Sequence, residues 1–114
     1  MYVGIARLEF HLPLCHSLKE KRQIVRRLVE RVRAQFKVSV GEVDHQDLWQ
    51  RTALGVALVG SDPAHVERMT VQIADFMERQ HLAEPLGRLV EVRPFGRDDE
   101  VPLGDAPAPW EDEP

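Results

Sequence analysis

The stretch Ser17-Leu-Lys-Glu-Lys-Arg22 marks the start of the first helix in this chain of 114 residues. Ser17 and Glu20 have the spacing of a capping box, in which each side chain accepts a hydrogen bond from the other residue's free backbone N–H. Apolar residues then recur three, four or seven positions apart, at Leu18, Val25, Leu28 and Val32. This spacing predicts an amphipathic helix over residues 17–36 that packs its apolar face on a sheet.

The segments around this helix predict one further helix and four strands. In residues 2–12 every second position is apolar or glycine, and the positions between them are Val3, Ile5, Arg7, Glu9 and His11. This alternation is typical of a half-buried strand. Residues 36–43 and 51–60 predict two strands joined as a hairpin. Asp62-Pro63 begins a second helix that ends near His81, and residues 89–95 predict the last strand.

This order of elements predicts an α+β fold, the ferredoxin-like βαββαβ sandwich. Right-handed crossovers place both helices on one face of a four-stranded antiparallel sheet, with strand order 4-1-3-2. The other face is expected to be open and polar, because Arg7, Glu9 and His11 of the first strand point toward it.

Charge divides the chain into two parts. The net charge is −4, but residues 1–95 carry +2 and residues 96–114 carry −6. Four prolines accompany this acidity, so the last segment cannot continue a helix or a central strand. We therefore expect a domain over residues 1–95 and an acidic Pro-rich tail over 96–114. Trp110 is expected to anchor this tail, whose carboxylates would compete with anionic ligands for the first helix.

Composition narrows the class of protein. No apolar run approaches the length of a membrane span, and the N-terminus starts as a strand, so we expect a cytoplasmic protein. Arginine outnumbers lysine twelve to three and asparagine is absent. This bias is compatible with a thermophilic protein that avoids thermolabile side chains, and equally with a GC-rich genome.

The first helix is the candidate nucleic-acid-binding surface. Residues 17–35 hold seven basic and two acidic side chains, a net charge of +5. The residues assigned to this surface are Lys19, Arg22, Arg26, Arg27 and Arg33. Arginine suits bidentate contacts with phosphate, so RNA or the ribosome is the leading partner. The outward positions of the first strand lack base-stacking aromatics, so contacts would be mainly to the backbone. The alternative is a solvated helix face, or one neutralised by the tail.

The connection between the second and third strands is a second candidate site, formed by Asp44, His45, Asp47 and Trp49. Exposed polar groups on a loop held by a rigid sheet often carry function. An enzyme hypothesis makes His45 a general base oriented by Asp44 or Asp47. The alternative is a hairpin with Asx-type turn bonds in which Leu48 and Trp49 pack over the sheet edge.

The chain predicts neither a metal site nor a cofactor. The spacing of His11, Cys15, His16 and the later histidines matches no zinc template. Cys15 is expected to be a small buried side chain near the helix start, although an exposed position there would lower its pKa.

Two motifs give the chain a family resemblance. The segments His16-Ser-Leu-Lys-Glu-Lys-Arg22 and Phe36-Lys-Val-Ser-Val-Gly-Glu-Val-Asp-His-Gln-Asp-Leu-Trp-Gln-Arg51 resemble those of the small bacterial YlxP-like proteins, an uncharacterised family with a domain-of-unknown-function label. The resemblance covers residues 1–95. It implies a ferredoxin-like fold and a bacterial, cytoplasmic protein, often encoded among translation and ribosome-maturation factors, and it implies no catalytic residues.

Three functional hypotheses follow. The first is a binding module for RNA or the ribosome that uses the basic helix. The second is a protein-interaction or homo-oligomeric module that uses the open sheet face or an edge strand. The third is a small-molecule enzyme that uses the Asp44–Gln50 loop.

Overall fold

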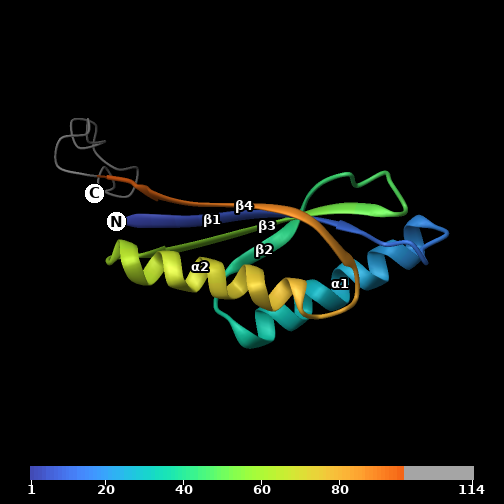
Figure 1. Cartoon of the computed structure of the whole chain (residues 1–114), viewed down its shortest axis with the longest axis horizontal. Helices are drawn as coiled ribbons and strands as arrows, with labels where there is room; N and C mark the ends of the chain where they lie inside the picture. The colour runs from blue at the N-terminus through green and yellow to red at the C-terminus, as the bar shows by residue number, and fades with distance from the viewer. Residues whose placement is uncertain (97–114) are drawn as a thin grey trace, which may run out of the picture.

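The computed structural model describes residues 1–96 and contains six elements (Figure 1). In chain order they are β1 (Tyr2–His11), α1 (Leu18–Gln35), β2 (Ser39–Asp44), β3 (Arg51–Gly60), α2 (Pro63–Glu78) and β4 (Glu84–Pro94). Ser17 caps α1 by accepting a hydrogen bond from the Glu20 N–H, as predicted. The second half of the predicted capping box was wrong, because the Glu20 carboxylate accepts from the N–H of His16, one residue earlier, rather than from that of Ser17. The predicted α+β fold and the predicted order of elements are confirmed.

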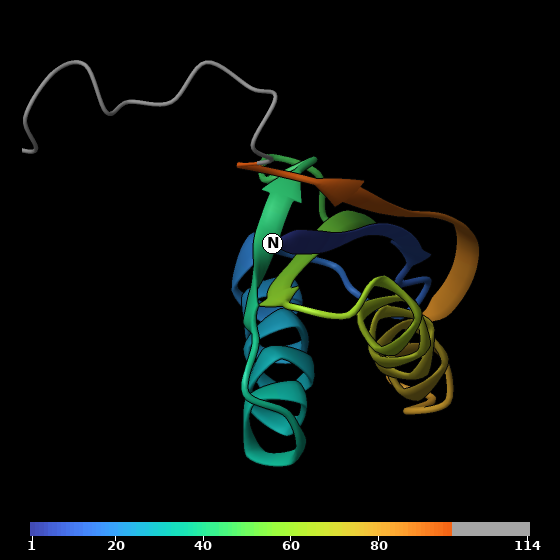
Figure 2. The ribbon, with the colours of Figure 1, turned by 90° about the vertical axis from the view of Figure 1, so that its left-hand side faces the viewer.

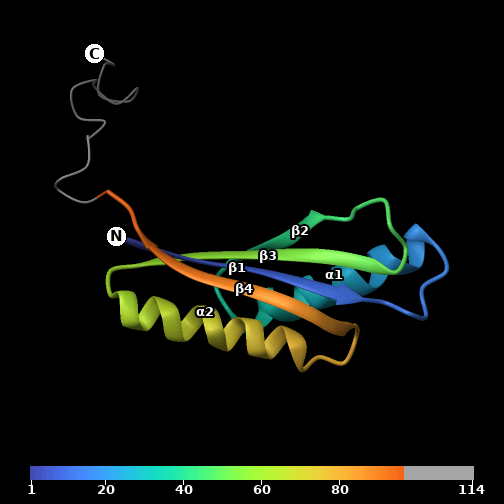
Figure 3. The ribbon, with the colours of Figure 1, turned by 45° about the horizontal axis from the view of Figure 1, so that its top comes forward.

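The four strands form one antiparallel sheet in the order β2-β3-β1-β4, as predicted. Figure 2 shows both helices on the same side of this sheet, and the opposite side is uncovered by either helix. Strands β2 and β4 are the two sheet edges. In Figure 3 the loop between β2 and β3 lies at the same end of the molecule as the start of α1.

Three predicted boundaries were wrong. Strand β2 begins at Ser39 rather than at residue 36, because Phe36 is the C-cap of α1 and its ring packs edge-on against Phe76, with centroids 5.3 Å apart. Helix α2 ends at Glu78. Strand β4 begins five residues before the predicted start, at Glu84. An edge strand tolerates Pro85, and an irregularity between Glu9 and Phe10 accommodates the start of this pairing.

The core lies between the sheet and the helices. It joins the even-numbered side chains of β1 to the inner faces of both helices, with Leu28 and Val32 buried as predicted and Val25 partly buried. Helix α2 lies so close to β1 that a Cβ at Gly4 would overlap the hydroxyl of Thr70. Thr70, which the apolar pattern did not identify, is fully buried and donates its hydroxyl to the Val66 carbonyl.

The outer face of the sheet is only partly polar, which corrects the prediction. Register places Val3 opposite Val59 and Ile5 opposite Ala57 on this face, beside the charged positions Arg7 and Glu9. Val59 is 65% exposed. The prediction was wrong because it considered β1 alone, whereas the outward positions of β3 are mostly apolar.

Two further sequence expectations concern membrane spans and the C-terminal segment. No helix among residues 1–96 has the length and apolar character needed to cross a membrane. The expected anchoring of Trp110 lies outside the described residues, and the division into a domain over 1–95 and a tail over 96–114 stays a prediction.

Candidate functional site

The solvent-facing side of α1 carries the predicted basic residues. Lys19, Arg22, Arg26, Arg27 and Arg33 are all exposed. None of the five forms an ion pair with another residue of the described part of the chain. Their charge is therefore available to a ligand.

Four of these residues form one row, which we call the basic stripe: Lys19, Arg22, Arg26 and Arg33. At 3.6 residues per turn they fall within about 60° of one another around the helix axis and span roughly 21 Å along it. Arg33 donates to the Val40 carbonyl at 3.1 Å, which places the stripe on the flank of α1 beside edge strand β2. Arg27 lies outside the stripe, on a different part of the helix surface.

Half of the other ten lysine and arginine side chains among residues 1–96 are neutralised by ion pairs. Each of the following has a carboxylate within 3.2 Å: Arg7, Lys21, Arg51, Arg88 and Arg93. Arg68 and Arg79 on α2 form no ion pair, but they lie along a surface that also contains Glu67 and Asp75. Glu30 is also exposed at the edge of the stripe, four residues after Arg26, but it forms no ion pair with another residue of 1–96. Within the described region the basic stripe therefore carries four cations that form no ion pair, with one anion beside them.

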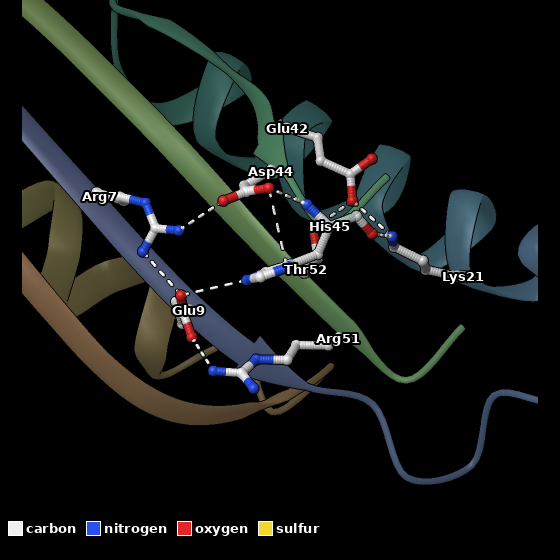
Figure 4. Close-up of polar contacts among 8 residues, drawn as sticks. All are labelled: Arg7, Glu9, Lys21, Glu42, Asp44, His45, Arg51 and Thr52. Atoms are coloured by element: carbon white, nitrogen blue, oxygen red, sulfur yellow. Dashed lines mark hydrogen bonds and ion pairs between the residues drawn. The ribbon is translucent and has the colours of Figure 1, made fainter. Parts of the chain in front are cut away.

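Lys21, which contributes to the +5 net charge of residues 17–35 but was not assigned to the binding surface, does not belong to this exposed charge. Its side chain is 1% exposed, and its Nζ lies 2.8 Å from Glu42 Oε2 and donates to the His45 carbonyl. The Thr52 hydroxyl donates to the same Glu42 oxygen. Figure 4 shows this group joining α1 to β2, β3 and the start of the loop.

A second charged cluster covers one end of the outer sheet face (Figure 4). Glu9 accepts hydrogen bonds from Arg51 at 2.5 Å and Arg7 at 2.8 Å, and His45 Nε2 lies 3.3 Å from it. These contacts, led by the Arg51 hydrogen bond, lower the pKa of Glu9 to about 2. The His45 backbone N–H, with help from Arg7, lowers the pKa of Asp44. The cluster is balanced in charge.

The structure brings Asp44 and His45 together but leaves Asp47 and Trp49 apart from them. His45 Nδ1 lies 3.9 Å from Asp44 Oδ1, while Nε2 faces Glu9. Both ring nitrogens therefore face carboxylates, and Asp47 is not among the partners of His45. Of the two carboxylates that the general-base hypothesis names, only Asp44 therefore lies beside the His45 ring, and the catalytic role of His45 stays a prediction.

The loop over residues 45–50 is fixed by hydrogen bonds at both ends. Lys21 Nζ donates a hydrogen bond to the His45 carbonyl, which also accepts one from the Leu48 N–H. Gln50 donates its side-chain amide to the carbonyls of Pro13 and Cys15 at 3.2 and 3.1 Å. His45 itself has a φ of +62°, a left-handed conformation that costs a non-glycine residue roughly 1–2 kcal/mol.

Leu48 and Trp49 project from this fixed loop into solvent, with exposures of 47% and 53%. About half of each side chain is therefore covered, and the expectation that they pack over the sheet edge stays a prediction. They line a shallow hollow together with His11, Asp47, Gln50 and Arg51. The hydrogen bonds that hold the loop use its backbone and the Gln50 amide, so the two large apolar side chains are left free.

Cys15 is buried as expected, and burial raises the pKa of its thiol. Among residues 1–96, no group of three or more His, Cys, Asp or Glu side chains is placed to hold a metal ion.

Sequence reasoning missed the roles of Lys21, Glu42 and Arg51. A signal existed for Lys21, because it stands four residues before Val25 and seven before Leu28, within the apolar row of the helix. Glu42 and Arg51 join these contacts only through strand register and a shift of the β2–β3 register between Glu42 and Asp44. No local sequence pattern indicates that register.

Comparison with known proteins gives two findings. Residues 3–87 match the family described as "Protein of unknown function (DUF503)". The chain is also 37% identical over 76 residues to the uncharacterised protein YlxP of Bacillus subtilis strain 168, an alignment that covers 67% of this chain and 83% of the relative.

Proposed function

Because the chain belongs to the DUF503 family, whose description states no function, we propose a function from its own surface: a non-enzymatic module that binds the phosphate backbone of RNA through the basic stripe of α1. The observation that carries this proposal is a row of exposed cations that form no ion pair with any other residue of 1–96, beside a sheet whose own cations are neutralised.

The arrangement of the stripe has an energetic cost in the absence of a ligand. Arg22 and Arg26 stand four residues apart on one face, where like charges destabilise a helix by a few tenths of a kcal/mol. A polyanion bound along the stripe would relieve this repulsion and release its own counterions. The guanidinium groups can each contact phosphate with two parallel hydrogen bonds. RNA is the form of polyanion that the family resemblance favours.

Salt dependence of binding tests the proposal. Affinity of the full chain for a fluorescent 12-nucleotide single-stranded RNA would be measured by anisotropy between 50 and 200 mM KCl. Each phosphate contact with a single strand contributes about 0.7 to the slope of log K against log salt. Replacing Arg22 and Arg26 together by Ala should therefore lower the slope by about one to two.

The matched control is the double variant R68A/R79A. Arg68 on α2 and Arg79 at its C-cap are exposed and have no ion pair among the described residues, so the control removes the same net charge. It should leave the slope nearly unchanged. Equal losses in the two double variants would reduce the effect to net charge, and salt-independent binding would contradict the proposal.

A second candidate function, a homodimer formed through the outer sheet face, is favoured by a separate observation. Five apolar side chains project from this face or its rim with exposures of 53–70%: Val43, Val59, Leu86, Leu89 and Phe95. Gly41 and Gly55 form part of a hollow on the same face. Projecting side chains and a hollow on one surface are what a self-complementary two-fold interface requires.

The area of the face suffices for such a dimer only if most of it is covered. Three strands of ten or eleven residues and one of six give a face of roughly 600 Å². Two copies packed together would bury about 1,200 Å², at the lower limit for specific stable interfaces. The balanced charges of the Glu9 cluster would not repel a second copy.

Sedimentation velocity between 1 and 200 µM tests the dimer. The wild type should become dimeric within this range, and Val59→Lys should stay monomeric because it places a charge in the apolar part of the contact. Leu14→Lys adds the same charge at a site that is 83% exposed and outside the sheet, and it should dimerise as the wild type does. A wild type that is monomeric throughout would contradict this candidate.

A further inference from the structure

We propose that Trp49 is a stacking site for one unpaired nucleobase, located at the Lys19 end of the basic stripe. This inference rests on the proposed function, because the same RNA strand would occupy both places. It adds a property that the stripe alone cannot give, namely preference for single-stranded over double-stranded RNA.

The first support is the exposure of a large aromatic side chain on a rigid loop. Trp49 is 53% exposed, although indole is among the side chains that gain most from burial. The loop that carries it is not loose, because Lys21, Gln50 and the Leu48 N–H fix it by hydrogen bonds. Stacking of a base on this ring would therefore require little ordering of the protein, so little of the binding free energy would be lost to it.

The second support is local strain and buried charge beneath the loop. His45 is held in a left-handed conformation by its backbone contacts, and such conformations concentrate at binding sites. The hydrogen bond that Lys21 donates to His45 comes from a fully buried ammonium group. Both features fix the direction of the loop.

The third support is the position of the loop relative to the stripe. The hydrogen bonds from Gln50 to Pro13 and Cys15, and from Lys21 to His45, attach the loop to the first turn of α1 and the segment before it. Figures 1 and 3 agree that the loop and the start of α1 lie at the same end of the molecule. A strand that follows the stripe toward Lys19 would therefore continue onto the loop.

The rim of the Trp49 hollow supplies polar groups for base edges. His11, Asp47 and Arg51 line it, and together they offer hydrogen-bond donors and acceptors. Stacking on an aromatic ring beside a cationic track is the usual way in which proteins hold single strands without strict sequence preference.

Tryptophan fluorescence tests the proposal directly. The chain has two tryptophans, so the variant W110F leaves Trp49 as the only indole emitter. Titrating this full-length variant with a 12-nucleotide single-stranded RNA should quench its emission, because a stacked base contacts the ring. A duplex of the same length should bind through the stripe with little quenching.

Substitution of the ring gives an independent readout. Trp49→Ala should weaken binding of the single strand roughly 5- to 150-fold, the usual effect of removing one stacking ring, while the salt slope stays unchanged. Trp49→Phe should restore most of the affinity. The matched control is Phe95→Ala, which removes an aromatic side chain that is 62% exposed in the segment after β4. Below 1 µM protein, where the candidate dimer is dissociated, this control should leave RNA affinity unchanged.

The outcomes separate this inference from the proposed function. If R22A/R26A lowers the salt slope but Trp49 emission does not change and W49A binds normally, the stacking site is refuted and the stripe stands. If W49A weakens single strand and duplex equally, the preference for an unpaired base is refuted. If the wild type binds neither RNA, both proposals are overturned.

Discussion

Replacing Lys21 by Met should destabilise the protein by about 3–5 kcal/mol, the usual cost of removing one partner from a buried ion pair. The substitution removes the ammonium that lies 2.8 Å from Glu42 and that donates to the His45 carbonyl. Glu42 is only 18% exposed, so its carboxylate would lose its cation without gaining full hydration. Met fills most of the vacated volume, so the loss would reflect charge and hydrogen bonding rather than a cavity.

Two further variants separate the effect of the ion pair on stability from the effects of helix propensity and of surface charge. Lys19→Met makes the same chemical change two residues away at an exposed position and should cost less than about 0.5 kcal/mol. K21M/E42Q replaces the carboxylate by a neutral amide, whose carbonyl oxygen can still accept a hydrogen bond from the Thr52 hydroxyl. The free energy of unfolding of this double variant should therefore exceed that of K21M alone by about 2 kcal/mol or more, because the unpaired buried charge is gone.

Urea denaturation followed by circular dichroism measures these differences. Hydrogen exchange adds a local readout, because loss of the Lys21 contact should speed exchange of loop amides such as that of Leu48. A loss below about 1 kcal/mol in K21M, or equal losses in K21M and K21M/E42Q, would refute the assignment of Lys21 as the buried cation that fixes the loop.

Three other predictions follow from the core, the Glu9 cluster and the charge of the tail. Leu28→Ala should cost about 2–5 kcal/mol in urea denaturation, because Leu28 is 2% exposed in the core; a near-neutral result would contradict its placement. The pKa of Glu9 is about 2 in the fold against an ordinary 4.5, so its ionised form stabilises the fold fully above about pH 5 and progressively less as the pH falls toward 2. The stability difference between wild type and E9Q should shrink over that interval, and a difference that grows on acidification would contradict the cluster. Neutralising Glu111, Asp112 and Glu113 should raise RNA affinity at low salt by more per charge removed than Glu67→Gln does, if the tail competes for the stripe; equal gains would leave only a net-charge effect.

The fold was predictable because local patterns agree with the topology. The capping residues of α1 and the alternation in β1 each indicate one element without ambiguity, and β3 has the predicted bounds of 51–60. The start of β4 was not predictable in the same way. Pro85 and Gly87 are poor strand formers, and only pairing with β1 across the irregularity near Glu9 draws them into the sheet.

The candidate site was predictable only in part, for the same physical reason. The exposed row on α1 follows from helix periodicity, so its residues could be named from the sequence. Lys21 shares that periodicity with the buried residues, but its charge argued for exposure, and only the register of β2 and β3 supplies the carboxylate that allows burial. The loop that carries Trp49 is fixed in part by hydrogen bonds that Gln50 makes to residues about 35 positions away, which no local sequence pattern indicates.

Nuclear magnetic resonance titration tests the central claim most directly. Uniformly ¹⁵N-labelled full-length protein at low salt would receive increasing amounts of the 12-nucleotide single-stranded RNA, and amide shifts would be followed residue by residue. The account predicts that, within the described region, the largest shifts lie between Lys19 and Arg33 and over loop residues 45–50, and that they disappear at high salt. Largest shifts on α2 or β4, or no shifts at any RNA concentration, would contradict it.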